Sequence, residues 1–272
     1  MSERAFRFGI VAATASTGAE WVATARRAEE LGYDTLLVPD TLNTLAPFPA
    51  LATAAASTRT LRVGTYVLSA PNRAPALVAW ESKSLHLLTG GRFELGLGGG
   101  RPGADRDAAA LGGSFGTPGE RLQRVADTIR AVRANGTPGP PIMVAASKPR
   151  MLRLAAEQAD IVALGLPPQA TEQELARVVG TLDRGSLELH VNVVAVAESA
   201  DAVPEWVSRM VGGDPRAMAA AGGFAFLLGT PAEIAAVLRR RRAELGISYI
   251  GVSALFMEQF APVLARLRET GS

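Results

Sequence analysis

Residues 88–101 read LTGGRFELGLGGGR, and this stretch decides the fold of the chain. Its first part is typical of a helix end, because a glycine after the last turn adopts the left-handed conformation that caps a helix. Residues 92–97 then predict a short buried strand, and Gly98, Gly99 and Gly100 follow where that strand ends. Such glycines form either a flexible loop or a place where the backbone approaches a ligand closely. The rest of the chain decides between these two interpretations.

Short apolar runs alternate with helical segments along the whole chain. We expect eight strands, over residues 6–12, 35–39, 61–67, 92–97, 141–145, 161–166, 187–196 and 249–252. We expect helices over residues 19–31, 48–57, 74–88, 119–134, 149–158, 172–182 and 231–245, a broken helical region over residues 203–221, and a last helix that ends near residue 268. Residues 98–118 show little periodicity and predict a long functional or mobile loop.

The eight strand–helix units favour one architecture. Strands that are apolar without alternation are typical of parallel sheets covered on both faces, and strands that alternate with helices indicate βαβ units. We therefore predict an α/β protein with a (β/α)8 TIM barrel, in a single domain over residues 1–272, ahead of an open doubly wound sheet. With 48% hydrophobic residues, the chain has enough apolar side chains for one large core.

The composition excludes several kinds of site. The chain has no cysteine, which excludes disulfides, thiolate metal sites and cysteine nucleophiles. We expect no metal centre from two distant histidines: His86 is expected to be structural, and His190 faces either the barrel lumen or the helices. A formal net charge of +2 and 6% aromatic residues give no nucleic-acid surface. The four arginines at residues 239–242 predict a solvated helix face.

The termini and the apolar runs bear on where the protein works. The short run after Arg7 predicts a first strand rather than a signal peptide. No run is long and apolar enough to predict a membrane span. Together with the absence of cysteine, these features favour a cytoplasmic protein without a membrane partner.

In a (β/α)8 barrel, the ligand site forms where the strands end at their C-termini. Asp40 and Thr41 follow the second predicted strand, and a carboxylate at such a place must be hydrogen-bonded or face a ligand. Ser69 and Ala70 follow the third strand. Glu94, inside the fourth strand, faces the lumen or pairs with an arginine on the helix side, and we favour the second arrangement.

The end of the fifth strand has the chemistry of an anion site. Ala145, Ala146 and Ser147 lead directly into a helix N-terminus, where free N–H groups and the helix dipole favour negative charge. Lys148 adds a positive charge. These residues predict a phosphate site, and the alternative is an ordinary helix start with solvated basic side chains.

Five segments together resemble the luciferase-like monooxygenase superfamily, most closely its branch that uses the deazaflavin coenzyme F420. They read AEELGYDTLLVPD (28–40), LTGGRFELGLGGG (88–100), FGTPGERL (115–122), PIMVAAS (141–147) and GTPAEI (229–234), in the order of the family. Each segment alone is unspecific, but together they span nearly the whole chain. The resemblance implies a (β/α)8 barrel that binds a flavin or deazaflavin at its C-terminal mouth.

The resemblance also implies roles for the candidate residues. Asp40 would lie near the coenzyme ring, and Ser69 and Ala70 would lie where many relatives have a non-prolyl cis peptide beneath it. The three glycines would leave room for the ring, and residues 145–148 would hold the phosphate. Many relatives have a histidine where this chain has Thr41. A hydroxyl does not titrate near neutrality, so we expect Thr41 to form hydrogen bonds only, with the chemistry resting on the coenzyme.

We therefore expect an oxidoreductase that transfers a hydride between F420 and a small organic substrate. The resemblance further implies a homodimer. The alternatives are an FMN-dependent flavin monooxygenase, a coenzyme-binding protein without turnover, and a metal-free aldolase or isomerase barrel that uses Lys148.

Overall fold

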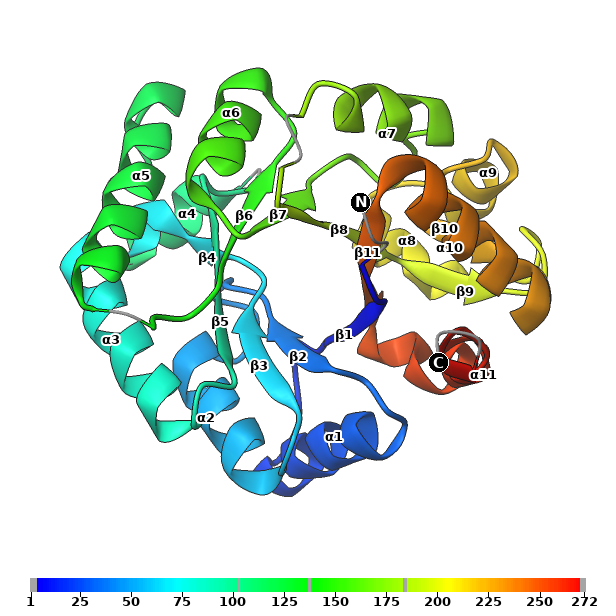
Figure 1. Ribbon diagram of the computed structural model, residues 1–272, viewed down its shortest axis with the longest axis horizontal. Helices are drawn as coiled ribbons and strands as arrows, with labels where there is room; N and C mark the ends of the chain where they lie inside the picture. Colours follow the sequence, from blue (N-terminus) through cyan, green and yellow to red (C-terminus); the bar gives the residue numbers. More distant parts are fainter. Residues whose placement is uncertain (1–3, 102, 137, 183–184, 270–272) are drawn as a thin grey trace.

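Eight parallel strands close into a barrel in the computed structural model, which describes residues 4–101, 103–136, 138–182 and 185–269 (Figure 1). The barrel strands are β1 (Arg7–Val11), β2 (Thr35–Val38), β3 (Arg62–Thr65), β5 (Phe93–Gly98), β6 (Ile142–Ala146), β7 (Ile161–Leu164), β8 (Glu188–Val193) and β11 (Ile247–Ser253). The sheet runs in the order β3-β2-β1-β11-β8-β7-β6-β5, and pairing of β3 with β5 closes it. The predicted TIM barrel is confirmed. The ends of the predicted domain, residues 1–3 and 270–272, lie outside the described residues.

The main helices surround the barrel (Figure 1). They are α1 (Gly18–Glu30), α2 (Pro47–Ser57), α3 (Pro75–Leu88), α5 (Pro118–Ala134), α6 (Pro149–Gln158), α7 (Glu172–Val179), α10 (Pro231–Leu245) and α11 (Met257–Glu269). Local signals set where several of them begin. Thr117, Thr171 and Thr230 each accept a hydrogen bond from the backbone N–H three residues on, and the glutamate there bonds back to the threonine N–H.

The structure corrects two of the expected elements. The stretch expected to be a loop, residues 98–118, contains helix α4 (Ala104–Ala110). The expected strand 187–196 divides into β8 and β9 (Ala195–Ala197). Strand β9 leaves the barrel and pairs with β10 (Phe226–Leu228), which lies beyond the expected helical region.

Short elements complete the connections at the mouth of the barrel. They are β4 (Leu68–Ser69), which pairs in parallel with the end of β5, and the 3-10 turns and helices η1 (Ala70–Asn72), η2 (Glu205–Val207), α8 (Ser208–Val211), α9 (Pro215–Ala220) and η3 (Ala254–Phe256). Among the helices of the described ranges, none combines the length and apolarity that a membrane span requires.

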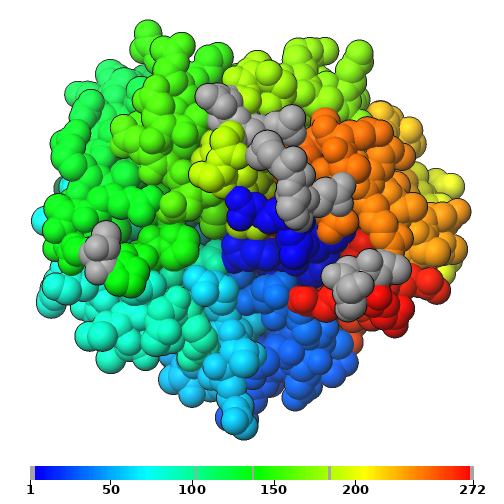
Figure 2. All heavy atoms as spheres, in the orientation of Figure 1, coloured from blue at the N-terminus to red at the C-terminus, as the bar shows by residue number. Residues whose placement is uncertain are grey.

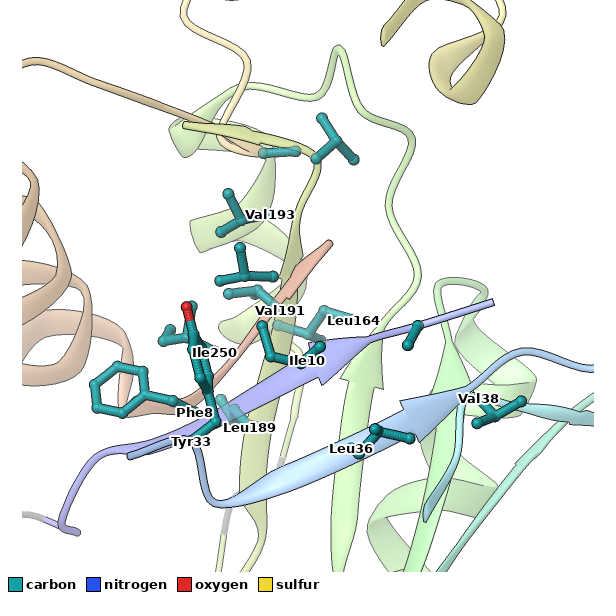
Figure 3. Packing of buried hydrophobic residues seen from close by; sticks show 14 of the residues in the cluster. Phe8, Ile10, Tyr33, Leu36, Val38, Leu164, Leu189, Val191, Val193 and Ile250 are labelled. Atoms are coloured by element: carbon teal, nitrogen blue, oxygen red, sulfur yellow. The ribbon is translucent and has the colours of Figure 1, made fainter. Parts of the chain in front are cut away.

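Side chains alternate between the two faces of each strand and therefore form two separate cores. Phe8 and Ile10 of β1 point outward and pack with side chains of β2, β7, β8 and β11 in the larger core beneath the helices (Figure 3). The inward-pointing residues form a smaller core in the lumen, made of Leu37, Met143, Ile161, Ala163 and Tyr249. The strands are thus covered on both faces, as their continuous apolar sequences predict.

Ion pairs fill the lumen at the end where the strands begin. The N-terminal segment lies in the middle of the molecular face shown in Figure 2. Here the Arg7 guanidinium bonds to Glu94 and lies 2.5 Å from Glu188, and Arg62 bonds to Glu94 at 2.5 Å. Glu94 therefore pairs with arginines of strands β1 and β3 inside the barrel, and our preference for the helix side is wrong.

Two arginines of the run 239–242 pack against neighbouring elements. Arg241 is buried, and its guanidinium bonds to Glu172 Oε1 and to the Phe224 carbonyl oxygen. Arg242 lies over the ring of Phe6 at 4.2 Å from its centroid. The predicted solvated face is wrong at these two positions, because α10 packs its arginines against neighbouring elements.

Candidate functional site

A pocket of about 390 Å³ lies where strands β2, β4, β5, β6 and β7 end. It is lined by Pro39, Asp40, Thr41, Tyr66, Val67, Ser69, Gly98, Gly99, Gly100, Arg101, Ala145, Ala146, Ser147 and Gly165. The structure thus brings together the predicted site residues from four separate strand ends. The exceptions are Ala70, which is buried in η1, and Lys148, which is exposed. No lysine is among the described residues that line the pocket, so the aldolase alternative lacks its amine there.

Two glycines of the opening stretch make room for the protein itself. A Cβ atom at Gly98 would lie 2.7 Å from the Val67 side chain. A Cβ at Gly100, whose φ is +89°, would lie 2.6 Å from the Phe115 ring. Both approaches are closer than van der Waals contact allows. Gly98 is therefore a buried strand residue rather than part of a flexible loop, and it lets Val67 reach the pocket wall.

Asp40 organises the wall of the pocket. Its Oδ2 accepts a hydrogen bond from the Ser69 backbone N–H at 2.9 Å and pairs with the Arg73 guanidinium. Both side chains of this ion pair are largely buried. Asp40 thus connects the end of β2 to the turn after β4 and fixes the backbone between them.

Thr41 forms a hydrogen-bonded turn with Thr44 in the loop after β2. The Thr44 hydroxyl donates to the Thr41 carbonyl oxygen at 2.8 Å, and the Thr41 hydroxyl lies 3.4 Å from the Thr44 hydroxyl. The Thr41 side chain is therefore held by a local turn while the residue lines the pocket.

The cis peptide lies at a different place from the one expected. It joins Tyr66 and Val67, at the end of β3, whereas Ser69 and Ala70 are three residues further on in β4 and η1. The expectation for Ser69 and Ala70 is wrong because the sequence motif places the strand end but not the peptide bond that turns there. Tyr66 and Val67 themselves line the pocket.

The start of α6 faces the pocket without a side-chain cap. Ala146 and Ser147 line the pocket, Lys148 is the N-cap residue, and its side chain accepts no hydrogen bond from the first turn. Pro149 occupies the first helical position, which lacks an N–H group. The remaining N–H groups of this turn are the kind of donors that hold an anion.

Sequence reasoning missed Tyr66, Val67 and Gly165 as lining residues. The apolar run 61–67 contains the first two, but it carries no signal of which side chains face the lumen.

The structure also shows that His190 faces the lumen and not the helices. It is fully buried in the lumen, with its ring centroid 4.9 Å from that of Tyr66 and 4.7 Å from that of Tyr249. Burial lowers the pKa of His190 to about 3, so its imidazole is neutral.

Comparison with protein families gives one match over most of the chain. A family model described as "Luciferase-like monooxygenase" matches residues 6–249. The chain is 30% identical over 155 residues to a 5,10-methylenetetrahydromethanopterin reductase of Methanolobus tindarius, which covers 50% of this chain and 47% of that protein. It is 32% identical over 121 residues to a 4-hydroxyprotoasukamycin monooxygenase of Streptomyces nodosus subsp. asukaensis. This match covers 42% of this chain and 29% of that protein. The matched segments span less than half of these relatives.

Solved structures share the fold. The coenzyme F420-dependent tetrahydromethanopterin reductase from Methanopyrus kandleri superposes with a TM-score of 0.72 at 14% identity, covering 97% of this chain and 98% of that one. A monooxygenase from Streptomyces bottropensis superposes with a TM-score of 0.71 at 19% identity and the same coverage. At these identities, the likeness establishes the barrel.

Proposed function

We propose that this chain, which belongs to the luciferase-like monooxygenase family, is an oxidoreductase that transfers a hydride between the deazaflavin coenzyme F420 and a small organic substrate. The observation that carries the proposal is the pocket at the strand ends, with the uncapped start of α6 on one side and the wall fixed by Asp40 on the other. Relatives named as reductases of a pterin substrate support the reductase reaction.

The residues present suit a coenzyme with a phosphate and a flat ring. Ser147 and the first N–H groups of α6 would hold the phosphate, because a helix N-terminus attracts negative charge. Gly99 adds no side chain to the space between this turn and the ring. Asp40 and Ser69 would define where the ring ends. When bound, the coenzyme supplies the hydride.

The protein's own contribution is orientation. The Asp40–Arg73 pair fixes the turn that carries Ser69 and Ala70, and Thr41 lines the same wall. Lys148, which is exposed beside the α6 terminus, would add positive charge near the phosphate. We propose no titrating role for Thr41, because a hydroxyl holds its proton near neutrality.

A flavin monooxygenase is the second candidate function. The monooxygenase among the relatives favours it, since the matched identity equals that of the reductase within a few per cent. A coenzyme-binding protein without turnover is the third candidate function, and Thr41 motivates it.

A turnover assay distinguishes these three functions. Reduced F420 is mixed with the protein and a panel of enones, imines and pterins under anaerobic conditions. We expect oxidation of F420 that depends on the added acceptor. F420 that is bound and never oxidised supports the binding protein, and activity only with reduced FMN and oxygen supports the monooxygenase.

We also propose that the chain forms a homodimer through α3. Four large apolar side chains of this helix are exposed: Leu77, Trp80, Leu87 and Leu88. A hollow of about 270 Å³ lies beside them, lined by Phe48, Trp80, Glu81, Ser84, Leu85 and Leu88. A two-fold axis over α3 would place the protruding Trp80 of each copy against the hollow of the other, which is the self-complementarity that a symmetric dimer needs.

A further inference from the structure

Tyr66 presents an unbonded hydroxyl to the pocket. The residue lines the pocket from the end of β3. Its hydroxyl bonds to no other residue in the described ranges, and it is not among the buried polar atoms that lack a partner. The hydroxyl is therefore accessible from the pocket, where a bound molecule can accept its hydrogen.

Three other polar side chains of the pocket wall already have partners, whereas the short Ser69 hydroxyl is buried without one. Asp40 pairs with Arg73 and accepts from the Ser69 N–H. The Arg101 guanidinium bonds to Asp107 Oδ2 at 2.9 Å. The Thr41 hydroxyl lies within its own turn. Tyr66 is thus the long neutral donor of this wall that is free to bond to a ligand.

His190 fixes the direction of the Tyr66 ring from below. The two rings lie 4.9 Å apart and are inclined by 55°, and the edge of His190 meets Tyr249 at 86°. Gly251 allows this packing, since a Cβ there would lie 2.6 Å from His190 Nε2. A ring held on one side by a buried ring and facing an opening on the other has little freedom, which favours one hydrogen-bond direction.

We propose that Tyr66 donates its hydroxyl hydrogen to an acceptor atom on the ring of the coenzyme bound in the pocket, and that His190 is the positioning residue that holds the Tyr66 ring. The inference rests on the proposed function. Burial among apolar lumen walls raises the pKa of the Tyr66 hydroxyl above its ordinary value, so it remains a donor over the whole working pH range. The Tyr66 hydroxyl keeps its proton in this hydrogen bond, and no proton transfer is required.

The chain has only three tyrosines, so each gives a separate signal when tyrosine carries ¹³C at Cζ. Tyr33 is the internal control, because its hydroxyl donates to the Met257 carbonyl oxygen at 2.8 Å on the helix side. Oxidised F420 is added until binding saturates, and Tyr66→Phe identifies the signal. We expect the Tyr66 signal to move and the Tyr33 signal to stay.

The affinity of the protein for F420 is the second measurement. Losing one hydrogen bond between neutral groups weakens binding about three- to tenfold, so we expect that change for Tyr66→Phe and none for Tyr33→Phe. A Tyr66 signal that stays in place at saturating F420, or an unchanged affinity of Tyr66→Phe, overturns the inference. Wild-type protein that does not bind F420 at all overturns the proposed function instead.

The positioning role of His190 has its own test. His190→Phe preserves a ring beneath Tyr66, and His190→Ala removes it. We expect the phenylalanine variant to bind F420 as the wild type does, and the alanine variant to show the same loss as Tyr66→Phe. Thermal unfolding confirms that both variants fold. A folded His190→Ala protein with wild-type affinity contradicts the role.

Discussion

Asp40 and Arg73 form a largely buried ion pair at the edge of the pocket, and the same Asp40 oxygen accepts the Ser69 backbone N–H at 2.9 Å. The pair joins the end of β2 to the turn that follows β4. It therefore stabilises the fold and shapes the pocket wall at once.

Asp40→Asn removes the charge but keeps an acceptor for the Ser69 N–H. Because it removes the carboxylate that bonds directly to the largely buried Arg73 guanidinium, we expect a loss of about 3–5 kcal/mol in the free energy of unfolding. Urea unfolding measures it. Asp127→Asn is the matched control, since Asp127 pairs with Arg130 at an exposed site where the loss is about 0–1 kcal/mol. Equal losses in the two variants would show that the Asp40 pair is not buried in solution.

Gly98→Ala tests the close approach of Val67. The added methyl would lie 2.7 Å from the Val67 side chain, and overpacking of this kind costs about 1–3 kcal/mol. Val67→Ala in the same chain is expected to recover part of the loss. Gly119→Ala, with its nearest neighbour 3.9 Å away, is expected to leave stability unchanged or improve it. A neutral Gly98→Ala would mean that the β5 end is looser than described.

The pH dependence of stability follows from His190. Its pKa of about 3 in the folded protein lies below the value near 6.5 of the unfolded chain. Below pH 6.5 the unfolded chain therefore binds a proton that the folded protein does not, and stability falls as the pH falls toward 3. We expect this group to contribute a slope of about 1.4 kcal/mol per pH unit.

Urea unfolding at pH 7, 6 and 5 for the wild type and His190→Phe isolates that slope. The difference between the two proteins in unfolding free energy should change by about 2 kcal/mol between pH 7 and 5. Parallel pH curves would place the His190 imidazole in contact with water.

Helices with terminal signals were predictable from the sequence almost to the residue. Helix α10 occupies the predicted residues 231–245 because Thr230 caps its start and Gly246 its end, and α6 occupies 149–158 because Pro149 begins it. These signals are local, so neighbours in space do not alter them. Where an end depends on a distant partner, prediction fails.

The end of strand β8 and the orientation of Tyr66 are two features that the sequence did not predict. Residues 187–196 carry no turn signal, and the break after Val193 arises because β9 pairs with β10, about 30 residues further on. Tyr66 and His190 lie inside apolar runs, and only the barrel register reveals that both point into the lumen. The turn at residues 145–147, which precedes α6 and lines the pocket, was predictable because small residues before a helix start carry a local signal.

The α3 surface predicts the oligomeric state. We expect light scattering to report a dimer of the 28.3 kDa chain, and Trp80→Lys to shift it to monomer, because a charge placed in the apolar contact must be desolvated. Leu111→Lys, at another exposed leucine, is the control and should remain dimeric. A wild-type monomer at micromolar concentration, or a dimeric Trp80→Lys, would remove α3 as the interface.

The most direct measurement is a titration of the protein with F420 and with FMN, followed by tryptophan fluorescence, for the wild type, Ser147→Asp and the exposed control Ser199→Asp. We expect micromolar binding of F420, weaker binding of FMN, and at least a tenfold loss in Ser147→Asp alone, about 1.4 kcal/mol, because its carboxylate repels the phosphate at the α6 start. Binding of neither coenzyme, or wild-type affinity of Ser147→Asp for F420, would contradict the proposed site.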